Sequence, residues 1–480
     1  MDLLLVHPYF LADDPVEREI MRPYPPLGIL YLSSHLRRAG LGVGVFDGTF
    51  ESVDALVARL ERERPAVVGL YCNLMTKRQA LRLIPACRRV GARIVLGGPD
   101  PPYHADEYLA RGADVIVVGE GERTLEALVP RLVARPGARD LADIAGLVYR
   151  DETGAVVRTP PRALLPDLDA QPWPDRDAID VEAYLRAWRA RHGAGSVSLV
   201  TARGCPYTCA WCSRSVFGDT HRRRSPVRVA DEVAHIVERY RPDRLWYADD
   251  VFTIHHGFLH AYAAEMAARN LRVPFECISR AERITEPVAD ALVRLGCARL
   301  WIGSESGSQR VLDAMDRRVS VEQVRRAARM LQTRGIRVGM FIMLGYDGER
   351  HEDLAATVAH LKRSSPDEFL TTVAYPIKGT PYYESVKDRL VEPGDFASTT
   401  DRDVDVAGRP GPRYYRFARR WMTAEVARHR HWHGGRYARA ARAAVSAAVG
   451  RVGMALTQSW LGHRGVVAPG PDACSLKPEA

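Results

Sequence analysis

Lysine, cysteine and long apolar runs are scarce in this sequence. It has 5 lysines against 63 arginines, and 8 cysteines in 480 residues. No uncharged apolar stretch approaches about 18 residues, so we expect no transmembrane helix. Residues 1–7 carry no basic segment before a short apolar run, which indicates a first β-strand rather than a signal peptide. Few, scattered cysteines are typical of a reducing compartment, and we expect a cytoplasmic protein.

Acidic residues are nearly absent from one stretch near the end of the chain. Residues 409–464 contain 12 arginines and one acidic residue, Glu425, whereas the whole chain has a net charge of +9. A basic segment of this kind can meet nucleic acid, a membrane surface or an anionic substrate. The excess of arginine over lysine indicates a GC-rich coding bias, which favours a solvated helix face. A protein associated with nucleic acid or with a membrane is thus the alternative from another functional class. Because the solvated helix face is favoured, we expect no nucleic-acid partner.

The chain is too long for one compact core, and its patterns divide it into residues 1–140, 141–194, 195–392 and 393–480. The first region alternates apolar strands with amphipathic helices, which predicts a doubly wound sheet of Rossmann or flavodoxin type. The expected strands are residues 3–6, 42–46, 66–71, 93–96 and 115–118, and the expected helices are 27–38, 53–63, 77–89 and 123–133. The second region predicts a β-hairpin and a proline-rich linker.

A second alternation of strands and helices occupies residues 195–392. The expected strands are residues 196–201, 244–247, 275–278, 298–302, 338–343 and 368–373, and the expected helices are 227–240, 257–268, 286–295, 321–333 and 352–362. Six such units predict a partial TIM-like barrel with chemistry at the carboxyl ends of its strands. The last region predicts a helical domain that caps the barrel mouth with aromatic residues such as Tyr415 and Trp421. The tail past Pro469 is expected to be disordered.

Three cysteines follow the first strand of this barrel with the spacing CxxxCxxC, at Cys205, Cys209 and Cys212. Three thiolates this close can hold three irons of a 4Fe–4S cluster. No fourth cysteine follows locally, so the fourth iron is left for a ligand that is not protein. A zinc knuckle with a distant fourth ligand such as His221 is the alternative.

The run from Arg203 to Cys212 resembles the signature of the radical S-adenosylmethionine (SAM) enzymes. In that family SAM binds the open iron, and the cluster donates an electron that releases a 5′-deoxyadenosyl radical. The segments 249–253, 302–308 and 341–349 resemble the family's SAM-contacting segments, although Tyr346-Asp347 replaces the middle of the usual Gly-x-Pro-Gly-Glu. The resemblance implies SAM contacts from Asp250, Glu305, Ser306 and Gly345.

Three segments of the first region resemble the cobalamin-binding domain that precedes many radical SAM enzymes: residues 24–32, 97–99 and 118–122. The implied cobalamin contacts are Pro26, Leu27, Asn73, Gly97, Gly98, Gly119, Glu120 and Gly121. The motif Asp-x-His-x-x-Gly is absent, so we expect no histidine as lower cobalt ligand. Cobalt without a strong axial donor favours Co(I), which suits repeated methylation. The alternative is a domain that keeps this fold and binds nothing.

The resemblance, which covers roughly residues 1–390, implies a cobalamin-dependent radical SAM enzyme. We expect a C-methyltransferase that modifies an unactivated carbon of a small molecule, such as a secondary metabolite. Its cofactors are then a 4Fe–4S cluster, SAM and cobalamin, and its partner is a one-electron reductant such as flavodoxin or ferredoxin. A non-methylating reaction, such as oxidative cyclisation, ring contraction or rearrangement, is the alternative among enzymes.

Overall fold

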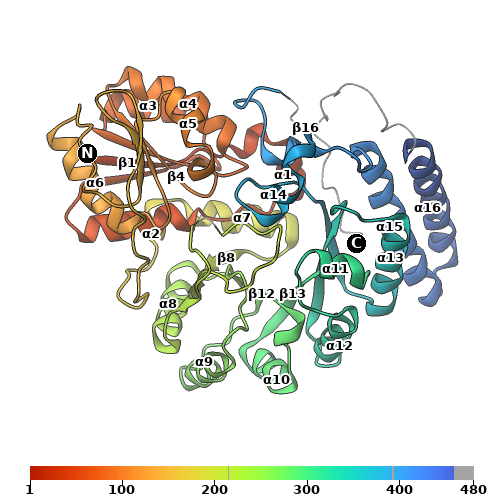
Figure 1. The fold of residues 1–480 in the computed structure, drawn as a ribbon. Helices are drawn as coiled ribbons and strands as arrows, with labels where there is room; N and C mark the ends of the chain where they lie inside the picture. Colours follow the sequence, from red (N-terminus) through yellow and green to blue (C-terminus); the bar gives the residue numbers. More distant parts are fainter. Residues whose placement is uncertain (215, 392–393, 459–480) are drawn as a thin grey trace.

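Two parallel sheets follow one another along the chain, each covered by helices, and a pair of long helices lies beside the second sheet (Figure 1). This computed structural model describes residues 1–214, 216–391 and 394–458. The predicted disordered tail past Pro469 lies outside the described residues. Among the helices in the described part of the chain, none is long and apolar enough to cross a membrane.

The first sheet has the strand order β2-β1-β3-β4-β5-β6-β7. Its strands are β1 (Leu3–His7), β2 (Val43–Asp47), β3 (Val67–Tyr71), β4 (Arg93–Gly97), β5 (Val115–Val117), β6 (Leu147–Arg150) and β7 (Val156–Arg158). Strands β1 to β5 are parallel, and β6 and β7 add the predicted hairpin in antiparallel register. The parallel strands are nearly continuous apolar runs because both faces of this sheet are covered.

Different helices cover the two faces of the first sheet. The helices are α1 (Pro15–Ile20), α2 (Leu27–Arg38), α3 (Val53–Glu63), α4 (Lys77–Arg89), α5 (Ala105–Ala110) and α6 (Glu122–Ala134). Leu56 of α3 and Leu83 of α4 are buried on one face. Leu30 of α2 and Leu128 of α6 are buried on the other. The helices predicted at residues 27–38, 53–63 and 77–89 have these bounds, whereas the sequence pattern does not predict the short α1 and α5.

A linker and helix α7 (Val181–His192) lead to the second sheet, whose six parallel strands have the order β15-β14-β13-β12-β11-β8. The strands are β8 (Ser196–Leu199), β11 (Arg244–Tyr247), β12 (Phe275–Ser279), β13 (Cys297–Glu305), β14 (Arg337–Leu344) and β15 (Glu368–Val373). The helices around it are α8 (Pro226–Tyr240), α9 (His256–Ala268), α10 (Glu286–Leu295), α11 (Gln309–Ala314), α12 (Val321–Gln332), α13 (His351–Ser364) and α14 (Pro381–Val386). This is the predicted open barrel of six strand–helix units, and the predicted fold class is confirmed.

The C-terminal part forms the hairpin of β16 (Leu390–Val391) with β17 (Asp405–Val406), followed by helices α15 (Pro412–His433) and α16 (Tyr437–Gln458). The two long helices lie side by side next to α13 (Figure 1). They approach closely because Gly450 leaves room for Trp421 and Gly453 for Phe417. The expected cap over the barrel mouth is therefore confined to the first turn of α15, where Tyr415 reaches Gly345.

Candidate functional site

The carboxyl ends of the strands in the two sheets face each other. Tyr103, in the loop after β4, packs against Gly379 in the turn after β15, where a Cβ on Gly379 would lie 2.0 Å from the tyrosine ring. The Tyr103 hydroxyl also hydrogen-bonds with Ser213. Gly119 follows β5, and a Cβ built on it would lie 3.7 Å from the carbonyl oxygen of Val216. Ligands of parallel α/β sheets bind at these carboxyl edges, so the two predicted cofactor regions are brought together.

The loop that carries the three cysteines is closed at its base by a short antiparallel ladder. Strands β9 (Ala202–Arg203) and β10 (Arg222–Arg223) pair with Arg222 opposite Arg203. Gly204 adopts a φ of +85°, and a Cβ there would lie 2.1 Å from the carbonyl oxygen of Thr220. Only glycine fits this pinched position. The far side of the loop is held by Ala210, whose N–H donates to the Met315 carbonyl oxygen over 3.0 Å.

The three cysteines differ in exposure: Cys209 is buried, Cys205 half-buried and Cys212 exposed. Two arginines approach Cys209 Sγ, Arg280 with Nη1 at 3.2 Å and Arg317 with Nη1 at 3.9 Å. Burial raises the pKa of the Cys209 thiol, and Arg280 opposes that rise. Two cations beside one sulfur suit a centre with several thiolates. The sequence pattern does not predict either arginine, since each lies far along the chain from the motif.

The geometry does not favour the zinc alternative. His221 packs edge-on against His255, with ring centroids 5.1 Å apart. Among the residues that the structure describes, the one group of three or more metal-binding side chains with ligand atoms within 4.8 Å of one another is Asp100, His104 and Asp401. The cysteines are not gathered as the ligands of one tetrahedral zinc ion must be.

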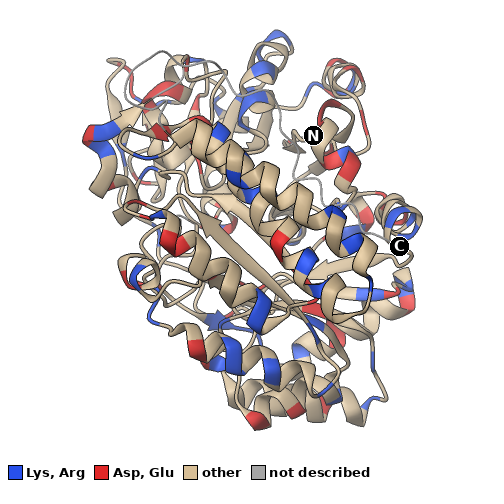
Figure 2. Ribbon diagram, turned by 90° about the vertical axis from the view of Figure 1, so that its right-hand side faces the viewer, with Lys and Arg blue, Asp and Glu red and all other residues tan. Residues whose placement is uncertain are grey.

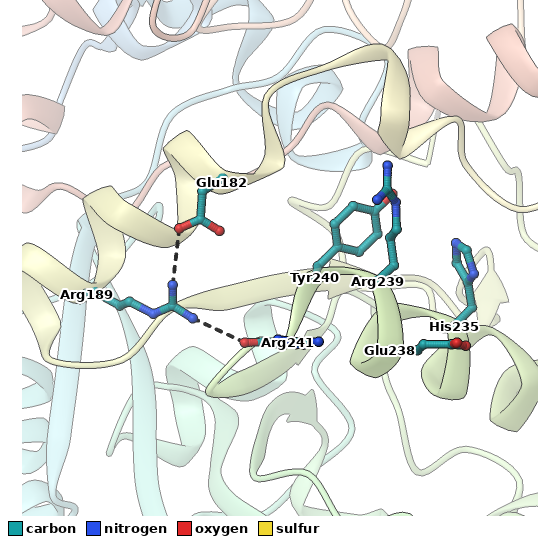
Figure 3. Close-up of a pocket in the computed structure, with 7 residues that line it drawn as sticks. All are labelled: Glu182, Arg189, His235, Glu238, Arg239, Tyr240 and Arg241. Carbon is teal, nitrogen blue, oxygen red and sulfur yellow. Dashed lines mark hydrogen bonds and ion pairs between the residues drawn. The ribbon is translucent and has the colours of Figure 1, made fainter.

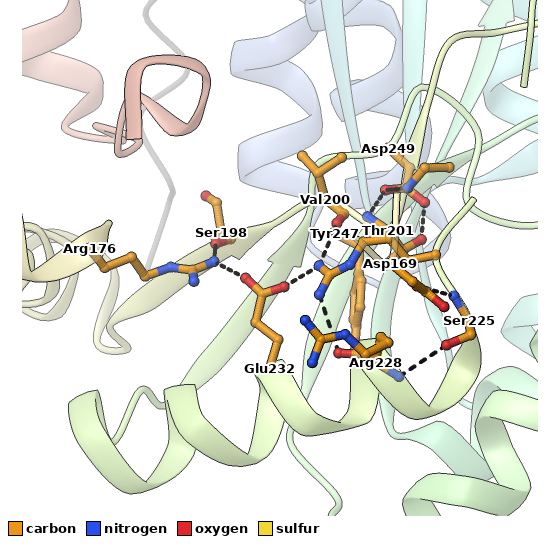
Figure 4. A network of polar contacts seen from close by, with 12 residues as sticks. Asp169, Arg176, Ser198, Val200, Thr201, Ser225, Arg228, Glu232, Tyr247 and Asp249 are labelled. Atoms are coloured by element: carbon orange, nitrogen blue, oxygen red, sulfur yellow. Dashed lines mark hydrogen bonds and ion pairs between the residues drawn. The ribbon is translucent and has the colours of Figure 1, made fainter. Parts of the chain in front are cut away.

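A buried polar network fixes the strand end from which the cysteine loop leaves (Figure 4). Asp249 accepts from the Thr201 backbone N–H over 2.6 Å and from the Ala202 N–H over 3.2 Å. Deeper in the same network, Glu232 pairs with Arg176 at 2.7 Å and with Arg224. Asp249 is therefore engaged in structure, whereas its neighbour Asp250 is exposed and free to meet a ligand. The protein that surrounds the Asp250 carboxyl group displaces part of its water and raises its pKa, and the charge of Asp249 raises it further.

Glu305, at the end of β13, is a buried carboxyl in a left-handed backbone conformation, with φ +58°. Burial raises its pKa to about 8, and Arg280 partly opposes the rise. Arg317 Nε lies 3.7 Å from Glu305 Oε1. Both side chains occupy the space beside Gly303, where a Cβ would lie 2.6 Å from Arg317 and 2.8 Å from Glu305. Strained residues with perturbed pKa values are typical of functional sites.

Ser306 follows Glu305 but is turned into the protein. Its hydroxyl lies 3.2 Å from Thr357 Oγ1 on α13 and accepts from the Ser308 N–H over 3.1 Å. The next residue, Gly307, leaves no room for a Cβ, which would lie 2.5 Å from the Ala356 carbonyl oxygen. The Gly-x-Glu-Ser-Gly segment thus presents Glu305 and uses its serine and glycine to pack against α13.

Gly345 directly follows β14 and lies beneath the first turn of α15. Its φ is +73°, and its N–H donates to Glu349 Oε2 over 2.6 Å. A Cβ on Gly345 would lie 2.6 Å from the Tyr415 ring. Burial raises the pKa of Glu349 to about 8, and its Oε1 has no hydrogen-bond partner. Arg409 Nη1 donates to the Gly345 carbonyl oxygen over 2.9 Å, so the C-terminal region seals this turn.

The residues predicted to contact cobalamin all lie at the carboxyl edge of the first sheet, at the end of β4 or in the loops and helix starts that follow β1, β3, β4 and β5. They are Pro26, Leu27, Asn73, Gly97, Gly98, Gly119, Glu120 and Gly121. Gly98 has a φ of +117°, and a Cβ there would lie 2.3 Å from the Cys72 carbonyl oxygen. The Asn73 side-chain oxygen accepts from the N–H groups of Met75 and Thr76, so it is used within its own turn.

Two histidines that the sequence pattern does not single out also lie at this edge. His7 ends β1, and its Nδ1 lies 3.1 Å from Asp47 Oδ1. His104 follows β4, and its Nε2 lies 3.8 Å from Asp401 and has no hydrogen-bond partner. Burial lowers the pKa of Lys77 nearby, and the charges of Asp100 and Asp401 oppose that shift in part. The Lys77 ammonium lies 3.5 Å from the centre of the Phe396 ring.

A hollow on another part of the surface is lined by charged side chains from α7 and the end of α8 (Figure 3). It is bounded by Glu182, Arg189, His235, Glu238, Arg239, Tyr240 and Arg241. Arg189 pairs with Glu182 at 3.3 Å and donates to the Arg241 carbonyl oxygen over 3.1 Å. Because α8 ends just before β11 begins, this hollow lies at the amino ends of the strands, away from the cysteine loop.

Comparison with known proteins agrees with this geometry. The family model of the radical SAM superfamily matches residues 199–361, and that of the B12 binding domain matches residues 17–129. An uncharacterized methyltransferase of Pyrococcus horikoshii is 28% identical over 80% of this chain and 83% of its own. The anaerobic magnesium-protoporphyrin IX monomethyl ester cyclase of Rubrivivax gelatinosus is 27% identical over 82% of this chain and 72% of its own.

Solved structures share the fold. The radical SAM methyltransferase TsrM of Kitasatospora setae, with cobalamin and a 4Fe–4S cluster bound, superposes with a TM-score of 0.66 at 22% identity, over 80% of this chain and 77% of that one. The cobalamin-dependent radical SAM enzyme OxsB superposes with a TM-score of 0.70 at 19% identity, over 89% and 67%. Fold and site thus define a cofactor-dependent α/β protein with two facing sheets. The chain contains a radical SAM domain and a B12 binding domain, and its cofactors are a 4Fe–4S cluster, SAM and cobalamin.

Proposed function

We propose that this chain is a methyltransferase that transfers a methyl group to an unactivated carbon of a small molecule. The observation that carries the proposal is the meeting of the two carboxyl edges, with Gly119 of the first unit facing Val216 in the cysteine loop of the second. This arrangement brings a corrin on the first sheet close to a cluster and SAM on the second. Holding the reactants in one space is the protein's main contribution to this kind of chemistry.

The residues present fit the three cofactors. Cys205, Cys209 and Cys212 are free thiols on one closed loop, and Arg280 and Arg317 supply positive charge beside Cys209. When bound, the cluster and SAM supply a radical that removes a substrate hydrogen atom, and cobalamin supplies the methyl group.

Two carboxyl groups are placed to orient SAM. Glu305 is buried near Arg280 and Arg317, and Asp250 is exposed beside the cysteine loop. An ionised carboxylate would accept hydrogen bonds from the ammonium group of SAM. Gly345 would offer its backbone to the adenine of SAM from a turn that Tyr415 and Arg409 cover. Ser306 shapes the turn next to Glu305 without a free hydroxyl.

The corrin would lie over the loops that contain Gly97, Gly98, Gly119 and Gly121, with Pro26 and Leu27 at its side. These positions offer backbone and small side chains, so a flat macrocycle can approach closely. Asn73 keeps its side-chain oxygen for its own turn and is at most a weak donor to cobalt. A one-electron reductant such as flavodoxin or ferredoxin is required to start each cycle.

A cyclisation without methyl transfer is the second candidate, because the cyclase of Rubrivivax gelatinosus covers this chain as fully as the methyltransferase of Pyrococcus horikoshii does. The two reactions differ in how they consume SAM. Methyl transfer uses one SAM for the methyl group and another for the radical, whereas cyclisation needs no methyl donor.

Product analysis of the reconstituted protein tests the proposal. The protein is loaded anaerobically with iron, sulfide and cobalamin and given a one-electron reductant such as reduced flavodoxin. It then receives SAM that carries a trideuterated methyl group, together with small-molecule extracts. We expect a metabolite that carries the labelled methyl, with one S-adenosylhomocysteine and one 5′-deoxyadenosine for each product. Formation of 5′-deoxyadenosine with a converted substrate but without S-adenosylhomocysteine would contradict methylation and support the cyclase-like reaction instead.

A further inference from the structure

Both arginines at the base of the cysteine loop reach one carboxylate of the first unit. Arg203 and Arg222 stand opposite each other in the β9–β10 ladder. Arg203 Nη1 donates to Glu120 Oε1 over 2.9 Å, and Arg222 Nη1 donates to Glu120 Oε2 over 2.9 Å. Glu120 lies in the loop between β5 and α6, so these bonds join the two units at the base of the cysteine loop.

The acceptor capacity of Glu120 is filled by these contacts. Oε1 accepts from Arg203 and also from Arg222, the latter over 3.0 Å. Oε2 accepts from Arg222 and from the Leu165 backbone N–H, the latter over 2.7 Å. A carboxylate has about four acceptor positions, so none remains for the amide groups of a corrin. The expected role of Glu120 as a cobalamin contact therefore competes with its role at the loop base.

The contacts between Glu120 and the two arginines are buried, and each charge in them needs an opposite charge beside it. Glu120 is 7% exposed and Arg203 is 6% exposed. Arg203 also pairs with Glu122 Oε1 at 2.7 Å, so two carboxylates of the first unit hold it. Removing one partner of a buried pair leaves the other charge without compensation inside the protein. Without Glu120, Arg203 would keep Glu122 as its one carboxylate partner, and Arg222 would lose the carboxylate that it pairs with. The base of the loop that leads to Cys205 would then be held less firmly.

We propose that Glu120 is a positioning residue for the iron–sulfur cluster: by holding Arg203 and Arg222 together, it fixes the base of the loop from which Cys205 binds iron. This rests on the proposed cluster binding by Cys205, Cys209 and Cys212. Under this proposal the first unit helps to form the cluster site, in addition to binding its own cofactor, cobalamin. Glu122 supports the same arrangement through Arg203 alone, so its contribution is smaller.

The test compares E120Q and E122Q with the unchanged full-length protein after anaerobic reconstitution. A matched control is E126Q, because Glu126 lies on the same helix, α6, and bonds to His35 within the first unit. Three quantities are measured: the rate at which a chelator removes iron, the electron paramagnetic resonance (EPR) spectrum of the reduced cluster, and the affinity for cobalamin. Thermal unfolding of the cluster-free variants checks that the fold persists.

We expect E120Q to lose iron about tenfold faster, as is typical when an outer partner of a metal ligand is removed. Its EPR spectrum should change, whereas its cobalamin affinity should stay that of the unchanged protein. E122Q should show a smaller effect in the same direction, and E126Q none. If E120Q does not fold, E122Q decides the question in the same way.

Unchanged iron loss and EPR in a folded E120Q would overturn the proposal, and a loss of cobalamin affinity alone would assign Glu120 to the corrin instead. Equal iron loss in E120Q and E126Q would also overturn it, since the effect would then be general to the first unit. Failure of the unchanged protein to take up a cluster would instead contradict the proposed function, so the two failures can be told apart.

Discussion

Arg280 donates a hydrogen bond from Nη1 to the Sγ atom of Cys209 over 3.2 Å, and its guanidinium lies 3.8 Å from the centre of the Tyr207 ring. The arginine follows β12, 71 residues after the cysteine that it contacts. It therefore places a positive charge against the cysteine loop from a different strand of the barrel. Hydrogen bonds and charge near the sulfurs set the reduction potential of iron–sulfur clusters.

Arg280→Gln should make the cluster harder to reduce, because the reduced cluster carries more negative charge and loses a nearby cation. We expect a potential about 60 mV more negative, which corresponds to a tenfold change in a one-electron equilibrium. A redox titration followed by EPR measures it. Arg283→Gln is the matched control, since Arg283 donates to the Tyr207 hydroxyl and not to a sulfur. A potential that does not change in Arg280→Gln would mean that Arg280 acts only on loop structure.

Replacing any one of Cys205, Cys209 and Cys212 by alanine should abolish the normal brown absorption of the cluster and all reductive cleavage of SAM. Each thiolate holds one iron, and two thiolates do not retain the cluster. Absorption spectra, iron content and 5′-deoxyadenosine formation measure this. The controls are Cys277→Ala and Cys297→Ala, two buried thiols on adjacent strands, which should retain both properties. A control cysteine as necessary as Cys209 would contradict the assignment.

Glu305→Gln should weaken the pH dependence of stability. Burial raises the pKa of Glu305 from 4.5 to about 8, so between these values the folded chain holds a proton that the unfolded chain has lost. Stability must then fall as pH rises through this range, by about 1.4 kcal/mol for each pH unit at most. In the cluster-free protein, Glu305→Gln should therefore raise the melting temperature more at pH 8 than at pH 5.

The exposed Glu384 supplies the control for this measurement, through Glu384→Gln. An identical pH profile in Glu305→Gln and the unchanged protein would show that Glu305 is ionised in the folded chain. In the loaded protein, Glu305→Ala should also weaken SAM binding, because the ligand's ammonium loses a carboxylate partner.

Bound cobalamin should have no protein histidine on its cobalt. The sequence lacks the motif Asp-x-His-x-x-Gly, which supplies the histidine ligand in other cobalamin domains. The two histidines at this edge are His7, bonded to Asp47, and His104, which faces Asp401. The EPR spectrum of the Co(II) form should therefore lack nitrogen splitting from an axial ligand. Nitrogen splitting in this spectrum would contradict the prediction. The variant that removes the splitting, His7→Ala or His104→Ala, would then identify the histidine that binds cobalt.

The alternation of apolar strands and amphipathic helices determined much of the fold. Helices at residues 27–38, 53–63 and 77–89 follow the pattern to the residue, since their period and end residues are local properties. The short α1 and α5 escaped the pattern because about six residues give too little periodicity to detect. The expected cap by the C-terminal helices is reduced to the first turn of α15 for a different reason. Gly450 and Gly453 let α16 pack against α15, a relation between two helices that no single helix reveals.

The sequence by itself determined the cysteine loop, the two α/β units and their order, because each depends on residues close together in the chain. The tertiary structure decided what surrounds the cysteines. Arg280 reaches Cys209 from the end of β12 and Arg317 reaches it from the loop after α11, while Glu120 reaches Arg203 from the other unit. A buried charge must find its partner in space, and that partner can lie anywhere along the chain. For this reason local sequence motifs can predict the cofactors. Only the folded chain shows which charged side chains surround the residues predicted to bind them.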